Sequence, residues 1–341
     1  MYFTTNFVGV FITIQVRYNL CVDSTKNVYI IVGPTSTGKT TLALKLAQKC
    51  NAEIISADSR QVVKYMDIGT GKMPVANHYT IEKYPDKWIV NGINIWGYDL
   101  ITPDSFFSAY DYSVFASKKI QKLLAEQKTV FIVGGTGFYI DVLVGRAGVS
   151  RVMPDYDLRD YLNGLSLEEL RNVLSGLNEY KLSKVDVNNK VRLIRAIEIE
   201  KNSQNVKNVQ SAEKDTALPH SSGFAYKFIG LTAGRAVLYS RADKWLNAVW
   251  DNGLPEEVIN LRKMGFGESR KLKGLVYKSC TEYLDGTLNE QEARERAKFD
   301  LHSYIRRQQT WFKRNEEINW FDIAASGYRQ NVEDFVELHC G

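Results

Sequence analysis

The chain has 341 residues, of which 44% are hydrophobic and 24% are charged, and its formal net charge is +5. Such a composition supplies enough apolar side chains for one large or two smaller packed domains. The four cysteines form no CxxC pair and have no ligand-like spacing. Their pattern excludes a disulfide framework and a cysteine zinc site, and it favours the reducing cytoplasm.

An apolar leader runs from Phe7 to Val16 near the start of the chain. It has no basic segment before it, no small-residue cleavage signal after it, and too few residues to span a bilayer. No other segment approaches a membrane span. We therefore interpret residues 1–26 as an extension, either a spare strand or a disordered tail, and expect no association with a membrane.

Strand-like and helix-like runs alternate in the next part of the chain. A strand is predicted at Val28–Gly33, a helix at Lys39–Lys49, and a second strand at Ala52–Asp58, beside the first strand. Lys128–Gly135 is another strand-like run, followed by Phe138–Gly145. This order is typical of a parallel sheet with helices on both faces.

The pattern changes after the first 144 residues to helices with polar connections. We predict a helical insertion at residues 145–223, with helices in Ser166–Leu177 and Val187–Ser203. A further strand, Tyr226–Gly234, precedes a helical C-terminal part that extends to about Arg314. The predicted organisation is a discontinuous core of residues 27–144 and 224–322, the insertion, and a C-terminal tail of residues 323–341.

The helical C-terminal part is strongly basic. Between Arg262 and Arg314 there are 13 Lys and Arg residues against 7 Asp and Glu residues, a larger excess than that of the whole chain. Such a segment is either a binding surface for a polyanion or a solvated helix face.

The sequence GPTSTGKT, Gly33–Thr40, matches the pattern G-x-x-x-x-G-K-[ST] between a predicted strand and a predicted helix. In such a loop the backbone amides and the helix N-terminus face phosphate oxygens, Lys39 adds a mobile positive charge, and the Thr40 hydroxyl can bind Mg²⁺. The motif predicts phosphate binding but does not identify the reaction. The predicted fold class is therefore α/β, a P-loop NTPase-like parallel sheet flanked by helices, with a helical insertion domain and a helical C-terminal part.

Two further polar residues follow predicted strands. Asp58 ends the second strand, and side chains at the carboxyl ends of parallel strands point into the ligand crevice. It is a candidate catalytic carboxylate, a magnesium ligand or a helix N-cap. Thr136 lies on a glycine-rich turn after the strand Val130–Val133. That turn either lets the backbone approach a ligand closely or is a tight connection.

Six motifs, taken together in order and spacing, resemble the tRNA dimethylallyltransferases, also called tRNA isopentenyltransferases. They are GPTSTGKT, DSRQVVKYMDIGTGK, VGGTGFYIDVLV, NNKVRLIRAIEI, GLPEEV and RRQQTWFKR, between about Val28 and Trp320. The resemblance implies that the loop holds the diphosphate of dimethylallyl diphosphate. The prenyl unit would pass to N6 of adenosine 37, in the tRNA anticodon loop, with release of pyrophosphate. It further implies Mg²⁺ as cofactor, and we expect a cytoplasmic monomer.

The resemblance also implies roles for individual residues. Lys39 and Thr40 would stabilise the leaving diphosphate, and Asp58 would accept a proton from the adenine amine as the C–N bond forms. The implied diphosphate-binding residues are Gly33, Pro34, Thr35, Ser36, Thr37, Gly38, Lys39, Thr40 and Lys273, and Thr40 would also bind the metal. The implied tRNA-binding residues are Asp58, Ser59, Arg60, Gln61, Thr136, Arg159, Arg192, Arg195, Arg306, Arg307 and Gln308. A structural salt bridge would explain Arg192 and Arg195 equally well.

The sequence departs from the family pattern at several positions. Val276 occupies a usual glycine, and Leu301 with His302 replaces a common Thr-Arg pair. For His302, which has no second ligand at metal spacing, we expect a surface or packing role. Trp311 and Trp320 are predicted to belong to the core.

Two other enzyme classes share the phosphate loop. A P-loop kinase or ATPase would usually add a second acidic magnesium ligand after a hydrophobic strand, whereas Val130–Val133 is followed by Gly-Gly-Thr. An adenylate isopentenyltransferase would prenylate a free nucleotide, and the long insertion and the basic C-terminal helix argue against it.

Overall fold

The computed structural model describes residues 26–72, 79–150, 152–206 and 224–338, so the apolar leader lies outside the described part of the chain. The strands are β1 (Lys26–Val32), β2 (Ala52–Ser56), β3 (Ile81–Lys83), β4 (Lys87–Val90), β5 (Ile93–Trp96), β6 (Thr129–Gly134), β7 (Phe224–Thr232) and β8 (Ile318–Asp322). The α-helices are α1 (Lys39–Lys49), α2 (Ala109–Ala125), α3 (Gly137–Leu143), α4 (Tyr156–Asn163), α5 (Leu167–Leu177), α6 (Glu179–Lys184), α7 (Lys190–Val206), α8 (Arg235–Asp251), α9 (Leu254–Lys263), α10 (Val276–Leu284), α11 (Glu290–Phe312) and α12 (Tyr328–Glu337).

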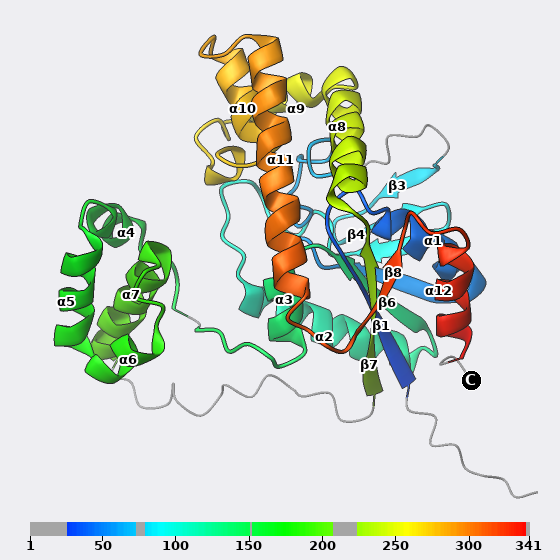
Figure 1. The fold of residues 1–341 in the computed structure, drawn as a ribbon, viewed down its shortest axis with the longest axis horizontal. Helices are drawn as coiled ribbons and strands as arrows, with labels where there is room; N and C mark the ends of the chain where they lie inside the picture. The colour runs from blue at the N-terminus through cyan, green and yellow to red at the C-terminus, as the bar shows by residue number, and fades with distance from the viewer. Residues whose placement is uncertain (1–25, 73–78, 151, 207–223, 339–341) are drawn as a thin grey trace, which may run out of the picture.

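One eight-stranded sheet forms the centre of the molecule, in the order β3-β4-β5-β2-β6-β1-β7-β8 (Figure 1). The pairings from β5 to β8 are parallel, whereas β3 and β4 are added antiparallel at one edge. This arrangement confirms the predicted α/β fold with a largely parallel sheet.

The strand order corrects one sequence prediction. The second strand, β2, was expected beside β1, but β6 lies between them, with Val28 opposite Val130 and Ala52 opposite Thr129. Apolar content reveals that a strand is buried on both faces, but it does not identify the strand's neighbours. Both edges of β1 are occupied by strands from much later in the chain, β6 and β7.

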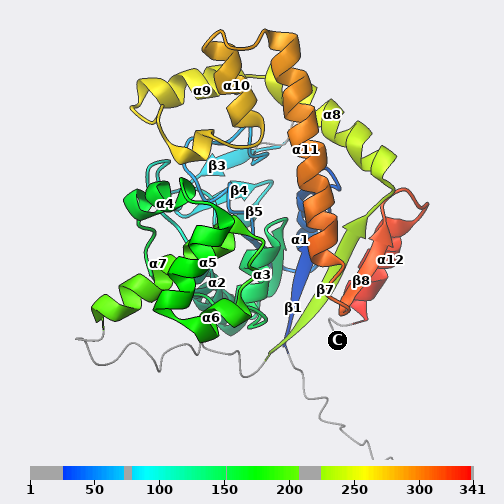
Figure 2. The same cartoon turned by 60° about the vertical axis from the view of Figure 1, so that its left-hand side comes forward.

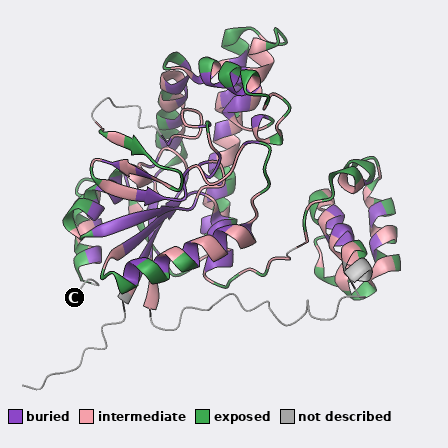
Figure 3. Ribbon diagram, turned by 180° about the vertical axis from the view of Figure 1, so that it is seen from behind, coloured by how far each residue is buried: buried purple, intermediate pink, exposed green. Residues whose placement is uncertain are grey.

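Two hydrophobic layers cover the sheet, because the side chains of a strand alternate between its faces. Tyr29 and Ile31 of β1 belong to the cluster that includes residues of α1 and α12, whereas Ile30 and Val32 belong to the cluster that includes residues of α2 and α3. Figure 3 shows this continuous buried centre, with the exposed residues on the outer parts of the helices. The C-terminal helix α12 is part of the layer, since Val336 is buried there.

Helices α4–α7 pack on one another to one side of the sheet (Figures 1 and 2). They have a small apolar core of their own, which contains Leu162, Leu170, Leu174, Leu193 and Ile197. A contact with the rest of the molecule is made by Arg270, which precedes α10. Its guanidinium lies 4.0 Å from the ring centroid of Tyr156 and 3.3 Å from the Asp160 carboxylate.

None of the helices within the described ranges is long and apolar enough to cross a membrane.

Candidate active site

The phosphate loop joins β1 to α1 and is shaped by two glycines. Gly33 has φ +144°, and a Cβ atom there would lie 2.2 Å from the Leu231 carbonyl oxygen, so a larger residue would collide with β7. Gly38 has φ +85° and is the N-cap of α1, where no side chain caps the helix. The first-turn N–H groups have no partner within the helix and are positioned to bind an anion.

Lys39 folds back over this loop. Its Nζ donates a 2.7 Å hydrogen bond to the Pro34 carbonyl oxygen, which also accepts from the Thr37 hydroxyl at 2.8 Å. Burial lowers the pKa of Lys39 to about 8, against the opposing effect of the Asp58 charge. The fold therefore brings Lys39 and Asp58, which follow different strands, within electrostatic reach of each other.

Asp58 follows β2 at the carboxyl edge of the sheet. Its Oδ1 accepts a 2.9 Å hydrogen bond from the Arg60 N–H, so part of the carboxylate stabilises its own turn. The next residue, Ser59, donates its N–H to the Thr136 hydroxyl oxygen at 2.9 Å. The Asp58 turn and the glycine turn after β6 are thereby joined.

Tyr304 of α11, which was not among the predicted site residues, completes this cluster. Its phenol lies close to the Thr136 side chain. Burial, reinforced by the charge of Asp58, raises the pKa of Tyr304 and keeps the phenol protonated. The available sequence signal is its spacing, since Tyr304 lies four residues before Gln308 and therefore on the same helix face.

Gln308 contacts both glycine-rich loops. Its Oε1 accepts the Thr35 N–H at 2.9 Å, and its Nε2 donates to the Gly135 carbonyl oxygen at 2.9 Å. The residue is 5% exposed. Its amide is thus engaged inside the protein, which differs from the RNA contact that the resemblance implied.

Gln61 is also engaged inside the protein. Its Oε1 accepts the Ser56 hydroxyl at 2.7 Å, and its Nε2 donates to the Thr70 carbonyl oxygen at 3.2 Å. These bonds connect β2 to the Asp-Ile-Gly-Thr loop. Gln61 is buried, so it supports the site from inside the protein.

Two basic residues, Arg60 and Lys271, contact each other next to the Asp58 turn. Arg60 Nη1 donates a 2.5 Å hydrogen bond to the Lys271 carbonyl oxygen. Burial, with help from the charge of Arg60, lowers the pKa of the half-buried Lys271 side chain. Lys271 was not predicted, whereas the predicted Lys273 is exposed and lies 3.6 Å from Glu268.

The Asp-Ile-Gly-Thr motif is held by a buried carboxylate on α9. Glu257 Oε2 accepts the N–H groups of Asp67 and Ile68, each at 2.7 Å, while Oε1 accepts the Tyr277 hydroxyl at 2.6 Å. Charge-assisted bonds of this kind are strong when water is excluded. Glu257 therefore gives this loop a defined shape beside the site.

Arg241 of α8 is a second cation near the phosphate loop. Its Nη2 lies 3.6 Å from the position that a Cβ atom on Gly38 would take. No sequence pattern indicates this residue, because α8 follows the loop by some 200 positions and carries no phosphate-binding motif. Together with Lys39, it places two positive groups close to the loop.

The insertion places its predicted RNA-binding arginines in different environments. Arg159 makes two hydrogen bonds to the fully buried Glu198 carboxylate, at 2.8 and 2.7 Å, and Arg195 bonds to the same group. Burial opposes ionisation of Glu198, but the bonds from both arginines outweigh it and lower its pKa. Arg192, in contrast, is exposed and lies 3.7 Å from Asp186. The geometry therefore gives Arg159 and Arg195 a structural role and leaves Arg192 at the surface.

Helix α11 presents Arg306 and Arg307 to solvent. Arg306 donates to the Tyr239 hydroxyl at 3.0 Å, and Arg307 lies 5.7 Å from the Tyr304 ring centroid. His302 on the same helix is 2.7 Å from Asp243 and stacks on Tyr239, which fits the predicted packing role.

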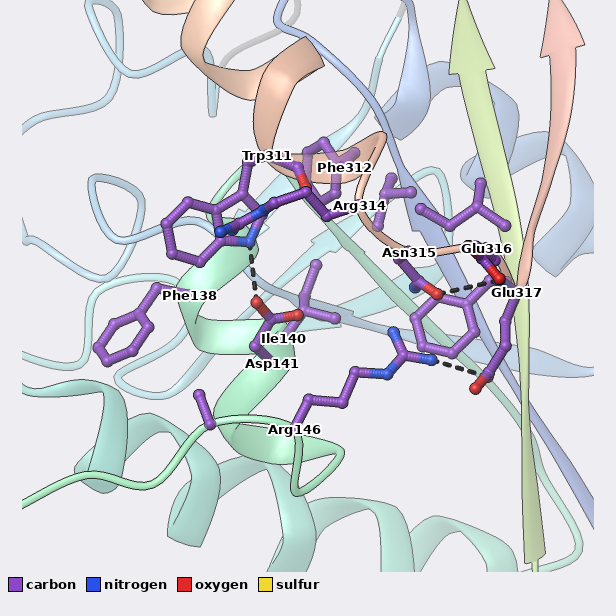
Figure 4. A pocket seen from close by; sticks show the side chains of 14 residues that line it. Phe138, Ile140, Asp141, Arg146, Trp311, Phe312, Arg314, Asn315, Glu316 and Glu317 are labelled. Carbon is purple, nitrogen blue, oxygen red and sulfur yellow. Dashed lines mark hydrogen bonds and ion pairs between the residues drawn. The ribbon is translucent and has the colours of Figure 1, made fainter. Parts of the chain in front are cut away.

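A separate hollow of about 560 Å³ lies between α3 and the C-terminal end of α11 (Figure 4). Trp311 Nε1 donates to Asp141 Oδ2 at 2.9 Å on one side, and Arg146 pairs with Glu317 at 2.7 Å on the other. The phosphate loop and Asp58 do not line this hollow. It is therefore distinct from the candidate active site.

Comparison with models of protein families identifies the family of this chain. The model described as IPP transferase matches residues 61–315, and one described as isopentenyl transferase matches residues 26–94. This chain belongs to the IPP transferase family. The family and the enzyme class predicted from the sequence are confirmed.

Similar proteins align with nearly the whole length of this chain. A tRNA dimethylallyltransferase of Acetivibrio thermocellus is 36% identical over 87% of this chain and 91% of its own length, and one of Alkaliphilus oremlandii is 32% identical over 91% and 96%. Among solved structures, the full-length tRNA isopentenylpyrophosphate transferase of Bacillus halodurans is 28% identical, has a TM-score of 0.64, and aligns over 93% of this chain and 97% of that protein. The relative from Staphylococcus epidermidis is 29% identical, has a TM-score of 0.62, and aligns over 92% and 98%.

Proposed function

We propose that this protein transfers the dimethylallyl group from dimethylallyl diphosphate to N6 of adenosine 37 in tRNA and releases pyrophosphate. The observation that carries the proposal is the pairing of a phosphate loop with a carboxylate. Lys39 and Asp58 lie at the same edge of the sheet, within electrostatic reach of each other. That arrangement supplies one group for the leaving diphosphate and one for the attacking amine.

The phosphate loop would bind and stabilise the departing diphosphate. Negative charge grows on its oxygens as the allylic C–O bond breaks, and the first-turn amides of α1 are oriented to receive it. Lys39 would exchange its bond to Pro34 for a phosphate oxygen, and Arg241 would approach from α8.

Magnesium fits the donor set of this site. A Mg²⁺ ion that binds a diphosphate takes most of its ligands from phosphate and water, and it needs one or two protein oxygens. The Thr40 hydroxyl, in the first turn of α1, would be the protein ligand. When bound, the ion would supply additional positive charge to the leaving group.

Asp58 would act on the other substrate. The adenine amine is a weak nucleophile because its lone pair is delocalised into the ring, so a carboxylate that accepts its proton assists C–N bond formation. Ser59, Thr136 and Tyr304 support the turn that carries Asp58. Tyr304, as a protonated phenol, would also donate a hydrogen bond within the site.

The tRNA must present its target base outside the anticodon-loop stack to reach Asp58. Arg306 and Arg307 on α11, and Arg192 on the insertion, would bind RNA phosphates, since all three side chains are exposed. The insertion would contact the same RNA from the side.

Prenyl transfer can be tested with labelled dimethylallyl diphosphate and three acceptors, namely unmodified tRNA, AMP and ATP. We expect prenylated adenosine in tRNA alone, detected by mass spectrometry of nucleosides. Labelled AMP or ATP would instead identify an adenylate isopentenyltransferase. Phosphate release from ATP without prenyl transfer would identify an ATPase.

A further inference from the structure

One face of helix α11 packs against the glycine turn after β6 and against α3. Tyr304, Gln308 and Trp311 lie at positions i, i+4 and i+7, and such residues share a helix face. Trp311 Nε1 donates a 2.9 Å hydrogen bond to Asp141 Oδ2 (Figure 4), and Tyr304 lies close to Thr136. Gln308, between them, reaches a second loop as well, namely the phosphate loop.

The Gln308 side chain is matched to its two partners. The Thr35 N–H requires an acceptor and the Gly135 carbonyl requires a donor, and a primary amide supplies both at a separation that suits the two loops. At 5% exposure, little water is available to replace either bond. Loss of the amide would leave two backbone groups unsatisfied.

The contact with the second loop is close. A Cβ atom on Gly135 would lie 2.3 Å from Gln308 Nε2, so the approach of the amide requires glycine at that position. Gln308 therefore connects the phosphate loop to the glycine turn after β6 through one hydrogen bond to each.

The anchored residue, Thr35, precedes a strained position in the phosphate loop. Ser36 has φ +64°, in the left-handed region that non-glycine residues seldom occupy. Such a conformation persists when surrounding contacts hold it. The bond from Thr35 to Gln308 is one of these contacts, and it engages the Thr35 N–H.

We propose that Gln308 is a positioning residue that holds the phosphate loop in the shape that binds a diphosphate. This inference rests on the proposed use of the loop for dimethylallyl diphosphate. It assigns Gln308 to substrate positioning in place of the RNA contact that the resemblance implied.

The test compares Gln308→Met with Gln309→Met in the full chain. Both changes remove an amide without adding charge, but the Gln309 amide makes only a long hydrogen bond of 3.5 Å, to the Ala233 carbonyl oxygen, within the described ranges. Calorimetry with inorganic pyrophosphate and Mg²⁺ should give a Kd about tenfold higher for Gln308→Met and unchanged for Gln309→Met, the scale expected when a well-made hydrogen-bond pair is lost. The KM for dimethylallyl diphosphate should rise with this Kd, while the Kd for tRNA stays the same.

A second variant, Gln308→Glu, tests the hydrogen-bond pattern itself. A neutral carboxylic acid can accept from Thr35 and donate to Gly135 as the amide does, whereas a carboxylate cannot donate. Pyrophosphate affinity relative to wild type should therefore recover as the pH falls and the new side chain is protonated. The Gln308→Met deficit should stay constant over the same pH range.

Three results would overturn the inference. Unchanged pyrophosphate affinity in folded Gln308→Met would do so, as would weakened tRNA affinity with normal pyrophosphate affinity, which would indicate an RNA contact. A Gln308→Glu deficit that does not change with pH would contradict the hydrogen-bond assignment. If wild-type protein binds pyrophosphate but transfers no prenyl group, the proposed function fails, yet the comparison of the two methionine variants still decides the role of Gln308.

Discussion

The Ser59 N–H donates a 2.9 Å hydrogen bond to the Thr136 hydroxyl oxygen. This bond joins the turn that carries Asp58 to the glycine turn after β6, and the Tyr304 phenol lies close to the same threonine. The candidate general base is thus positioned by residues from three elements that are remote in sequence.

Asp58→Asn removes the charge of the candidate base and keeps its size. We expect pyrophosphate and tRNA to bind nearly normally, while the single-turnover rate of prenyl transfer falls by ~100-fold or more, the usual scale for a positioned base. Recovery of the rate at high Mg²⁺ would indicate a magnesium ligand instead. Loss of thermal stability with a normal rate in the folded fraction would indicate a structural cap, since Asp58 also accepts the Arg60 N–H.

Lys39 should make diphosphate binding depend on pH. Its pKa is lowered to about 8, so the ammonium is present below that pH and is lost as the pH rises through it. The Kd for pyrophosphate should therefore rise above about pH 8. Because the Asp58 charge raises the pKa of Lys39, the Asp58→Asn variant should lose affinity at a lower pH than wild type.

Replacement of the lysine provides the control for that titration. Lys39→Ala should cut prenyl transfer by ~100-fold or more and leave the fold intact. Its weaker pyrophosphate binding should no longer change near pH 8. If Lys39→Ala keeps the wild-type pH dependence of pyrophosphate binding, Lys39 is not the titrating group.

Arg241→Gln tests the second cation near the phosphate loop. We expect the Kd for pyrophosphate to rise by about tenfold, because a charge-assisted contact with a phosphate oxygen is lost. Arg235→Gln is the matched control, since this exposed arginine begins the same helix at a position away from the Arg241 face. Equal effects of the two changes would show that net charge, and not the position of Arg241, controls binding.

The two arginines on α11 should contribute to the salt dependence of tRNA binding. Each phosphate contact releases counterions, so changing both Arg306 and Arg307 to alanine should lower the slope of log K against log salt by about 1 to 2. Fluorescence anisotropy between low and moderate salt would measure the slope. Arg329→Ala on α12 is the control, and an unchanged slope in the double variant would place the RNA elsewhere.

Glu198 should stabilise the insertion. Removing the charge of a buried carboxylate that pairs with Arg159 and Arg195 should cost about 3 kcal/mol in that helical unit. We expect hydrogen exchange in residues 156–206 to accelerate in Glu198→Gln, whereas the exposed Glu168→Gln should behave as wild type. If exchange is unchanged, the two arginines do not act as structural partners.

The Glu198 carboxylate should also make the stability of the insertion depend on pH. Its pKa is lower in the folded state than the ordinary value of 4.5, so its stabilising contribution is present above pH 4.5 and is lost as the pH falls through the folded value. Protection of residues 156–206 should fall accordingly in wild type, and this pH effect should be smaller in Glu198→Gln.

The sequence by itself determined the local features of this protein. The run Val28–Lys49 specified a buried strand, a glycine-shaped loop and a helix, because each depends on neighbouring residues and their backbone preferences. The order of motifs also specified the family. Asp58 could be selected in the same way, since it directly follows an apolar strand.

The tertiary structure decided which remote groups meet. Strand order placed β6 between β1 and β2, and α11 then brought Tyr304 and Gln308 onto the two glycine turns. Arg159 and Arg195 have the residue type and position of RNA ligands, yet a buried carboxylate engages both. Periodicity and motifs describe what a side chain can bind, whereas packing determines whether its partner is a nucleic acid, a substrate or another part of the same chain.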